Sequence, residues 1–201
     1  MAPPTTHPVP TLGIIELSSI AKGLQVCDFM LKKAEVRLLR SGPVGCGKFM
    51  IFITGDEADL LEAVEEGRFQ ADPFLVSWTF LPNLHPQVFT ALEGKKNPGS
   101  GTDALGIVEA QALAALIHAS DRAVKATAAH LVELTFDLDL GGKGYFTLAG
   151  QLAELEVSIA TAVEVLQTEN AYIHSEILAR PHARVRDLVL QGLEGPCSSR
   201  A

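Results

Sequence analysis

The sequence predicts an α/β fold: two tandem copies of one domain, each an α+β sandwich with helices packed against a mostly antiparallel sheet. Three observations predict it. Residues recur at a nearly constant offset along the 201-residue chain. Apolar runs follow the same order of strand and helix periods in each half. With 47% hydrophobic and 20% charged residues, the chain has enough apolar material for a core and too little charge for disorder.

The internal repeat can be followed residue by residue. Leu12–Glu16 (LGIIE) returns as Leu105–Glu109 (LGIVE), an offset of 93 positions (105 minus 12). Farther along, Gly47–Lys48 corresponds to Gly142–Lys143, an offset of 95 (142 minus 47). A register that persists through a whole copy and shifts once indicates a duplication, with two residues added in the second copy.

The repeat also predicts the domain bounds. The first domain is expected over residues 11–92 and the second over residues 103–191. Residues 93–102 are expected to form a linker because they are polar and rich in glycine and proline. The Pro-rich residues 1–10 and the tail 192–201 are expected to be disordered ends.

The first copy is expected to contain a strand, a helix, two strands around a loop, a second helix and a last strand. Its strands are predicted at Thr11–Leu17, Val36–Arg40, Phe49–Thr54 and Phe74–Phe80. The first helix is predicted to bury one stripe, at steps of four and three residues: Ile20, Leu24, Cys27, Leu31 and Ala34. The second helix begins at Gly55–Asp56 and is expected to stop at Gly67, and Ser41–Lys48 is expected to be a glycine-rich loop.

The second copy predicts the same order of elements. Its strands are expected at Ala104–Glu109, His130–Phe136, Tyr145–Ala149 and Tyr172–Leu178. Its helices are expected at Ala112–Thr127 and Leu152–Leu166. A second glycine-rich loop lies between the second and third of these strands.

Charge and motif content exclude several classes of function. Sixteen basic and 24 acidic residues give a net charge of −8, which argues against a nucleic-acid or anionic-membrane partner. No apolar run predicts a membrane span, and the first ten residues lack the pattern of a secretory signal. No nucleophile motif or complete phosphate-binding motif is present, so the chain is not expected to be an enzyme. Three widely spaced cysteines favour a reducing compartment over a disulfide framework.

Both copies carry the pattern of a known family. The first reads LGIIELSSIAKGLQVCDFMLKKAEVRLL, a glycine loop, GKFMIFITGD and a terminal NLHP. The second reads DALGIVEAQALAALIHASDRAVKATAAHLVEL, GGKGYFTLAG and ILARPH. Each resembles a bacterial microcompartment shell domain, and together they cover Thr11–Arg184. Because each copy begins with its LGI(I/V)E strand, the chain resembles the unpermuted, tandem-domain trimeric shell proteins, whose domains are ferredoxin-like.

The resemblance implies an assembly role in the shell of a bacterial microcompartment in the cytoplasm. Three chains would form a flat, pseudo-hexagonal homotrimer that tiles with other shell hexamers and pentamers around encapsulated enzymes. It implies that loops from both copies line the central pore, here Gly45, Cys46, Gly47, Leu140, Gly141 and Gly142. It also implies an assembly edge at Lys32, Lys125, Arg180, Pro181 and His182. Neither nucleic acid nor membrane is expected as a partner.

Cys46 is the residue with the sharpest chemical implication. The closest resemblance is to trimeric shell proteins of propanediol-utilising compartments that carry an iron–sulfur cluster. One chain lacks the grouped cysteines such a cluster needs, but three Cys46 thiolates at a three-fold axis could hold a shared [4Fe–4S] cluster and serve an electron-transfer partner. Those relatives have C-P-G-K, whereas Cys46 directly precedes Gly47-Lys48. A free thiol beside an open metabolite pore is therefore the alternative.

A rival from another class stays open on the residues alone. Duplicated ferredoxin-like domains also form soluble, ligand-binding or enzymatic trimers. That class predicts discrete trimers with a ligand between subunits, whereas a shell protein predicts extended sheets or tubes. The absence of a catalytic motif favours the shell protein.

Overall fold

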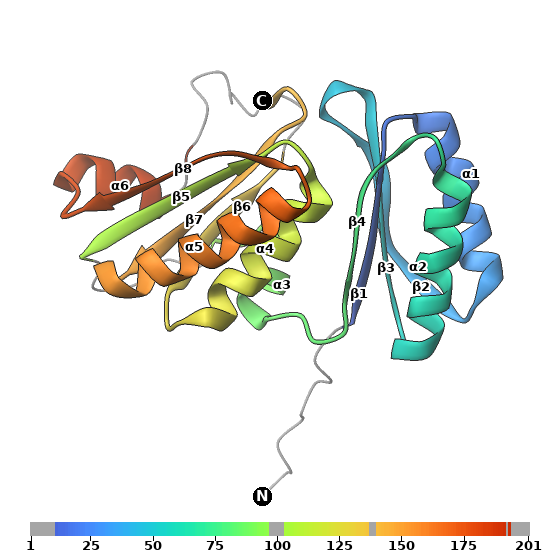
Figure 1. Ribbon diagram of the computed structural model, residues 1–201, viewed down its shortest axis with the longest axis horizontal. Coiled ribbons are helices and arrows are strands. Elements are labelled where there is room, and N and C mark those ends of the chain that lie inside the picture. The colour runs from blue at the N-terminus through green and yellow to red at the C-terminus, as the bar shows by residue number, and fades with distance from the viewer. Residues whose placement is uncertain (1–10, 97–102, 137–139, 192, 194–201) are drawn as a thin grey trace, which may run out of the picture. The chain divides into compact units, whose positions relative to one another are not determined.

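The computed structural model describes residues 11–96, 103–136, 140–191 and 193 (Figure 1). By their contacts, these residues form two compact units, divided between Pro86 and Gln87. The predictions for residues 1–10, for most of the linker and for the tail other than Leu193 lie outside the described residues, and the predicted domain bounds stay a prediction.

The first unit is a four-stranded antiparallel sheet with two helices. Its strands lie in the order β2-β3-β1-β4, and every neighbouring pair is antiparallel. The strands are β1 (Leu12–Leu17), β2 (Val36–Val44), β3 (Lys48–Gly55) and β4 (Leu75–Leu81). Helices α1 (Ile20–Lys33) and α2 (Glu57–Ala71) cover one face of this sheet (Figure 1).

The second unit repeats this architecture in the order β6-β7-β5-β8. Its strands are β5 (Ala104–Ala110), β6 (His130–Thr135), β7 (Gly144–Gly150) and β8 (Tyr172–Ala179). Its two sheet-covering helices are α4 (Leu113–Ala126) and α5 (Leu152–Thr168). The predicted fold class, two tandem α/β domains with antiparallel sheets, is confirmed. No helix in the described ranges has the length and apolar character needed to span a bilayer.

Two short helices that the sequence analysis did not predict follow the two repeats. They are α3 (Pro86–Leu92) and α6 (Ala183–Gln191). Val189 of α6 packs against Leu105 and Ala149 of the second sheet. Gly106, the neighbour of Leu105, faces α5, so α6 covers the opposite face of that sheet.

The two cores fill the same space between the first helix and the third strand of each unit with residues of exchanged size. In the first unit, a Cβ on Gly23 of α1 would lie 2.3 Å from Cδ1 of Phe49 on β3. In the second unit the sizes are exchanged. Leu116 of α4 stands at the position of Gly23, and a Cβ on Gly144 of β7 would lie 2.7 Å from its Cδ2. The bulky residue moves from strand to helix while the volume stays filled.

This packing corrects the stripe predicted for the first helix. The buried side of α1 consists of Gly23, Val26, Cys27 and Met30, so only Cys27 belongs to both sets. Ile20, Leu24 and Leu31 are instead 44%, 60% and 38% exposed. The prediction chose the larger apolar residues at helical spacing. Helix α1 instead packs on the sheet at Gly23, because the absence of a side chain there leaves room for the ring of Phe49.

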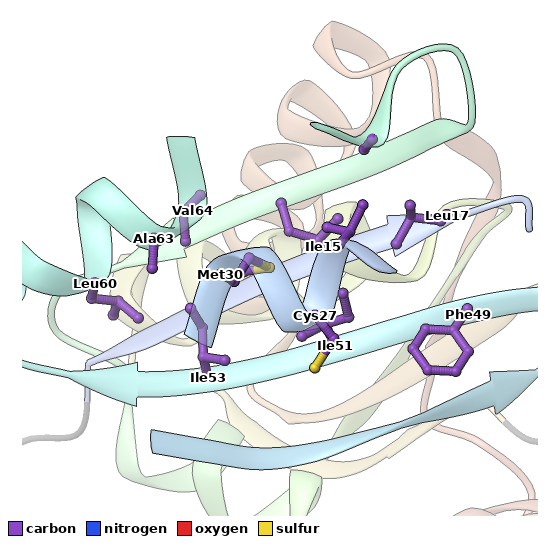
Figure 2. Packing of buried hydrophobic residues seen from close by; sticks show 12 residues of the cluster. Ile15, Leu17, Cys27, Met30, Phe49, Ile51, Ile53, Leu60, Ala63 and Val64 are labelled. Carbon is purple, nitrogen blue, oxygen red and sulfur yellow. The ribbon is translucent and has the colours of Figure 1, made fainter. Parts of the chain in front are cut away.

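The predicted stop of the second helix is also wrong. Helix α2 continues through Gly67 to Ala71. A Cβ on Gly67 would lie 2.7 Å from Sδ of Met30, so this glycine marks the place where α1 and α2 pack closely. Figure 2 shows Met30 and Cys27 among the core side chains of β1, β3 and α2. The glycine serves packing between helices and does not end one.

The loop predicted at Ser41–Lys48 is mostly strand. Strand β2 runs through Gly42 and Pro43 to Val44, and Pro43 pairs with Phe49 of β3. Because β2 is an edge strand with β3 as its sheet neighbour, a proline without a backbone N–H is tolerated there. The connection between β2 and β3 shrinks to the single turn at Gly45–Gly47.

Candidate functional site

The candidate site is the tight turn that joins β2 to β3. Cys46 has φ 60° and ψ 29°, and Gly47 has φ 73°. The backbone N–H of Lys48 donates to the carbonyl oxygen of Gly45, which closes the turn. Positive φ at both central residues is the geometry of a type I′ hairpin turn, whose twist matches that of the flanking strands.

The second unit contains the same turn in the position that the repeat predicts. Gly141 and Gly142 have φ 62° and 81°, and Lys143 donates its backbone N–H to the oxygen of Leu140 at 3.3 Å. Residues 137–139, which precede it, lie outside the described residues. The shared geometry supports the 95-residue offset and pairs Cys46 with Gly141.

Cys46 therefore stands where its repeat has a glycine. A residue with a Cβ in this left-handed region costs about 1–2 kcal/mol relative to its right-handed conformation, whereas glycine adopts it freely. Cys46 is also exposed and free. A strained side chain kept at an exposed turn points to a use for the thiol itself, since glycine would make the same turn at lower cost.

The turn also explains the departure from the C-P-G-K pattern. With Gly47-Lys48 held in register, the proline of that pattern would stand at position 46, where φ is 60°. The proline ring fixes φ near −65°, so this turn cannot accept it. In this chain the cysteine itself holds the first central position of the turn, directly before Gly47.

The other described cysteine does not join the site. Cys27 lies in the core between α1 and the sheet, as predicted. Burial raises the pKa of its thiol from the ordinary value of 9.0, and a hydrogen bond with Ser41 opposes this shift. Among the residues that the structure describes, no three histidine, cysteine or acidic side chains group into a metal site. The described part of one chain thus offers one exposed thiol, and an iron–sulfur cluster fits Cys46 only where several chains supply ligands together.

An ion pair stands beside each turn. In the first unit, Nζ of Lys48 lies 3.0 Å from Oε1 of Glu16, and the glutamate side chain is fully buried. In the second, Nζ of Lys143 lies 3.2 Å from Oε2 of Glu109, with both side chains exposed. Sequence analysis did not assign a role to either glutamate. Their recurrence at the end of both LGI(I/V)E strands was the signal that could have found them.

The predicted edge residues lie on both units. Lys32 on α1 pairs with Asp28 at 2.6 Å, and Lys125 on α4 pairs with Asp121 at 2.5 Å. Arg180, Pro181 and His182 form the connection between β8 and α6. Arg180 has φ 51° and its N–H donates to the oxygen of Asp103, while Nδ1 of His182 accepts from the N–H of Arg184. Each lysine thus recurs with its acidic partner. At the 95-residue offset, the first unit has His85 in place of Arg180.

The sequence matches the BMC domain family twice, over residues 11–84 and 104–181. The chain belongs to the BMC domain family. It is 36% identical over 181 residues to the bacterial microcompartment shell protein PduT of Citrobacter freundii, covering 90% of this chain and 98% of that protein. It is a tandem BMC-domain shell protein of a bacterial microcompartment, with a structural and not an enzymatic role.

Solved structures agree with this assignment. A microcompartment protein from Desulfitobacterium hafniense DCB superposes with a TM-score of 0.73 at 35% identity, covering 89% of this chain and 99% of that one. A fused permuted hexameric shell protein of the RMM microcompartment superposes with a TM-score of 0.60 at 19% identity, covering 80% and 85%, and supports the fold alone. Membership of the BMC domain family favours the shell protein over a soluble enzymatic trimer, and BMC shell proteins assemble into oligomers within shells.

Proposed function

We propose that three chains form a pseudo-hexagonal tile of the shell, with the turn at Cys46 and its counterpart at Gly141 alternating around a central pore. The three Cys46 thiolates then meet near the axis and hold one iron–sulfur cluster. The observation that carries this proposal is the strained, exposed Cys46 at a turn that its own repeat builds from glycine.

The surfaces of the two repeats support a closed ring. On α1, the apolar side chains of Ile20, Leu24 and Leu31 are exposed. Their counterparts on α4 at an offset of 93 are all buried: Leu113, Ile117 and Val124. An apolar face that is covered in one repeat and bare in the other is suited to a neighbouring copy of the chain. Repeated head-to-tail contacts of this kind close into a ring when the rotation allows it.

The turn residues suit the proposed pore. Gly47 and Gly141 have no atom within 4 Å of where a Cβ would stand, so both positions border open space. Bare backbone lets six turns approach an axis closely. Among the described residues, Cys46 is the exposed cysteine of each chain, and its thiolate would bind iron there. When bound, such a cluster supplies one-electron transfer across the shell.

The test is iron content together with visible absorbance of protein purified without air. The wild-type chain is expected to be coloured and to contain iron, and Cys46→Ser is expected to lose both while it keeps its oligomeric mass. Cys27→Ser serves as the matched control, because its thiol is buried in the core and should not affect the iron content. A colourless, iron-free wild-type oligomer would contradict the cluster and leave the open metabolite pore.

We further propose that Lys32 and Lys125 lie on the edges at which tiles meet, together with Arg180, Pro181 and His182. The support is the recurrence of the lysine and its acidic partner at equivalent positions of both repeats. Lys32→Asp is expected to abolish sheets or tubes in electron micrographs of concentrated protein without unfolding the oligomer. Lys33→Asp, the neighbouring exposed lysine, is the control and should still assemble. Equal assembly by both variants would contradict the placement of Lys32 on an assembly edge.

A further inference from the structure

The residue that closes the cysteine turn is tied to a central strand. Lys48 closes the turn through its backbone and reaches Glu16 of β1 through its side chain. Glu16 stands opposite Met50 in the β1–β3 ladder, two residues beyond Lys48 along β3. The two side chains are therefore diagonal neighbours on the sheet face away from Phe49 and the helices. One ion pair joins the exposed turn to the middle of the sheet.

Burial distinguishes this ion pair from its counterpart. The Glu16 side chain is fully buried and that of Lys48 is 16% exposed, whereas those of Glu109 and Lys143 are 37% and 52% exposed. Exposed ion pairs contribute little because water screens them. Removing one partner of a buried pair is far more damaging, because the remaining charge is left without compensation. The first turn is held firmly where the second is held weakly.

We propose that Glu16 is a positioning residue for the Cys46 thiol. A left-handed residue with a side chain persists only where its surroundings fix it. On one side of Cys46, β2 pairs with β3 up to Val44 and Lys48. On the other, the carboxylate of Glu16 holds Lys48 and so sets the direction in which the thiol leaves the sheet. The inference rests on the proposed function in one respect, that this thiol is a metal ligand.

The experiment compares Glu16→Gln with the matched variant Glu109→Gln. Both are made in the full-length chain with Cys197→Ser, so that the remaining thiols are Cys27 and Cys46. In Glu16→Gln, we expect the affinity for iron to fall about tenfold, the lower end of the effect of losing an outer-shell partner. The electron paramagnetic resonance lines of the reduced cluster should broaden as the thiolates lose a single orientation. Glu109→Gln should match the Cys197→Ser parent in iron affinity and in the paramagnetic resonance line widths.

A second measurement does not depend on the cluster. In iron-free protein, hydrogen exchange of the Lys48 amide reports whether the turn is closed. We expect this amide to exchange faster in Glu16→Gln, while the Lys143 amide is unchanged in Glu109→Gln. Faster exchange at Lys48 in a protein that never binds iron would overturn the proposed cluster and retain the role of Glu16. Unchanged exchange and an unchanged cluster in Glu16→Gln would overturn that role and retain the cluster.

A double variant distinguishes loss of the Glu16–Lys48 ion pair from the effect of leaving the Lys48 charge without a partner. Glu16→Gln with Lys48→Met removes both charges and keeps similar side-chain volumes, so the sheet should fold. If the ion pair positions the turn, the amide at position 48 should exchange as fast as in Glu16→Gln. Recovery of the original rate in the double variant would show that a stranded Lys48 caused the effect, and would overturn the proposal.

Discussion

The two repeats form the same turn with different residues. The first turn carries an exposed cysteine in a left-handed conformation and stands beside a buried ion pair, and the second carries a glycine beside an exposed ion pair. A single-domain shell protein would present six identical turns to its axis. In the proposed trimer, duplication within one chain would free three of the six turns to take on chemistry, while the other three keep the low-cost glycine turn. On that proposal, the first turn is functional and the second is structural.

The helices α1 and α4 differ in the same informative way. Leu24 and Ile117 occupy equivalent positions, yet Leu24 is 60% exposed and Ile117 is fully buried. On the proposed trimer, the uncovered apolar face of α1 is a surface for a neighbouring chain.

The largest expected effect comes from placing a charge at equivalent positions of α4 and α1. Ile117→Asp places a carboxylate in an apolar site and should destabilise the chain by at least about 4 kcal/mol, which prevents folding. Leu24→Asp should leave the circular dichroism spectrum intact and dissociate the trimer, as measured by analytical ultracentrifugation. Leu61→Asp, which changes an exposed leucine of α2, should stay trimeric. A trimeric Leu24→Asp chain would remove the α1 face from the interface.

An intermediate effect sharpens the comparison of the turns. Cys46→Gly should raise the free energy of unfolding by about 1 kcal/mol, because it removes a side chain from a left-handed residue. Gly141→Ala should lower it by a similar amount for the same reason. Gly42→Ala is the control, because this strand residue has open space for a Cβ and should change the value by less than about 0.5 kcal/mol. Urea denaturation of the iron-free chains measures all three, and a destabilised Cys46→Gly would contradict the assigned strain.

The smallest effect concerns the two cysteines at alkaline pH. The folded-state pKa of Cys27 lies above its ordinary value of 9.0 because burial disfavours the thiolate. Unfolded chains therefore lose this proton first. The contribution of the neutral thiol is fully present below pH 9.0 and is lost as the pH rises through the folded-state pKa. Cys27→Ala should show a shallower loss of stability above pH 9 than Cys46→Ala in thermal melts, and identical pH profiles would contradict this.

The repeat made the fold and the turn predictable, and tertiary packing decided the remainder. The sequence repeat aligns Gly47 with Gly142 and therefore Cys46 with Gly141. The structure shows that these two residues hold the same position of the same turn. The buried face of α1 was not predictable, since it depends on which side of the helix can approach Phe49. The strand through Pro43 was also missed because edge position, not composition, makes a proline acceptable there.

The role of Glu16 illustrates the same limit at the site. Its position in the repeated LGI(I/V)E strand was visible in the sequence, and its burial was not. A glutamate at the end of a strand is usually solvated, and only the β1–β3 register brings it within reach of Lys48. Pairings between strands distant in sequence carry information that a local pattern lacks.

Native mass spectrometry of the chain purified without air tests the central idea most directly. The account predicts a trimer whose mass exceeds that of three chains by one four-iron, four-sulfur cluster, and a Cys46→Ser trimer without that added mass. A monomeric wild-type chain, or a wild-type trimer with the mass of protein alone, would contradict the meeting of three Cys46 thiolates around one cluster.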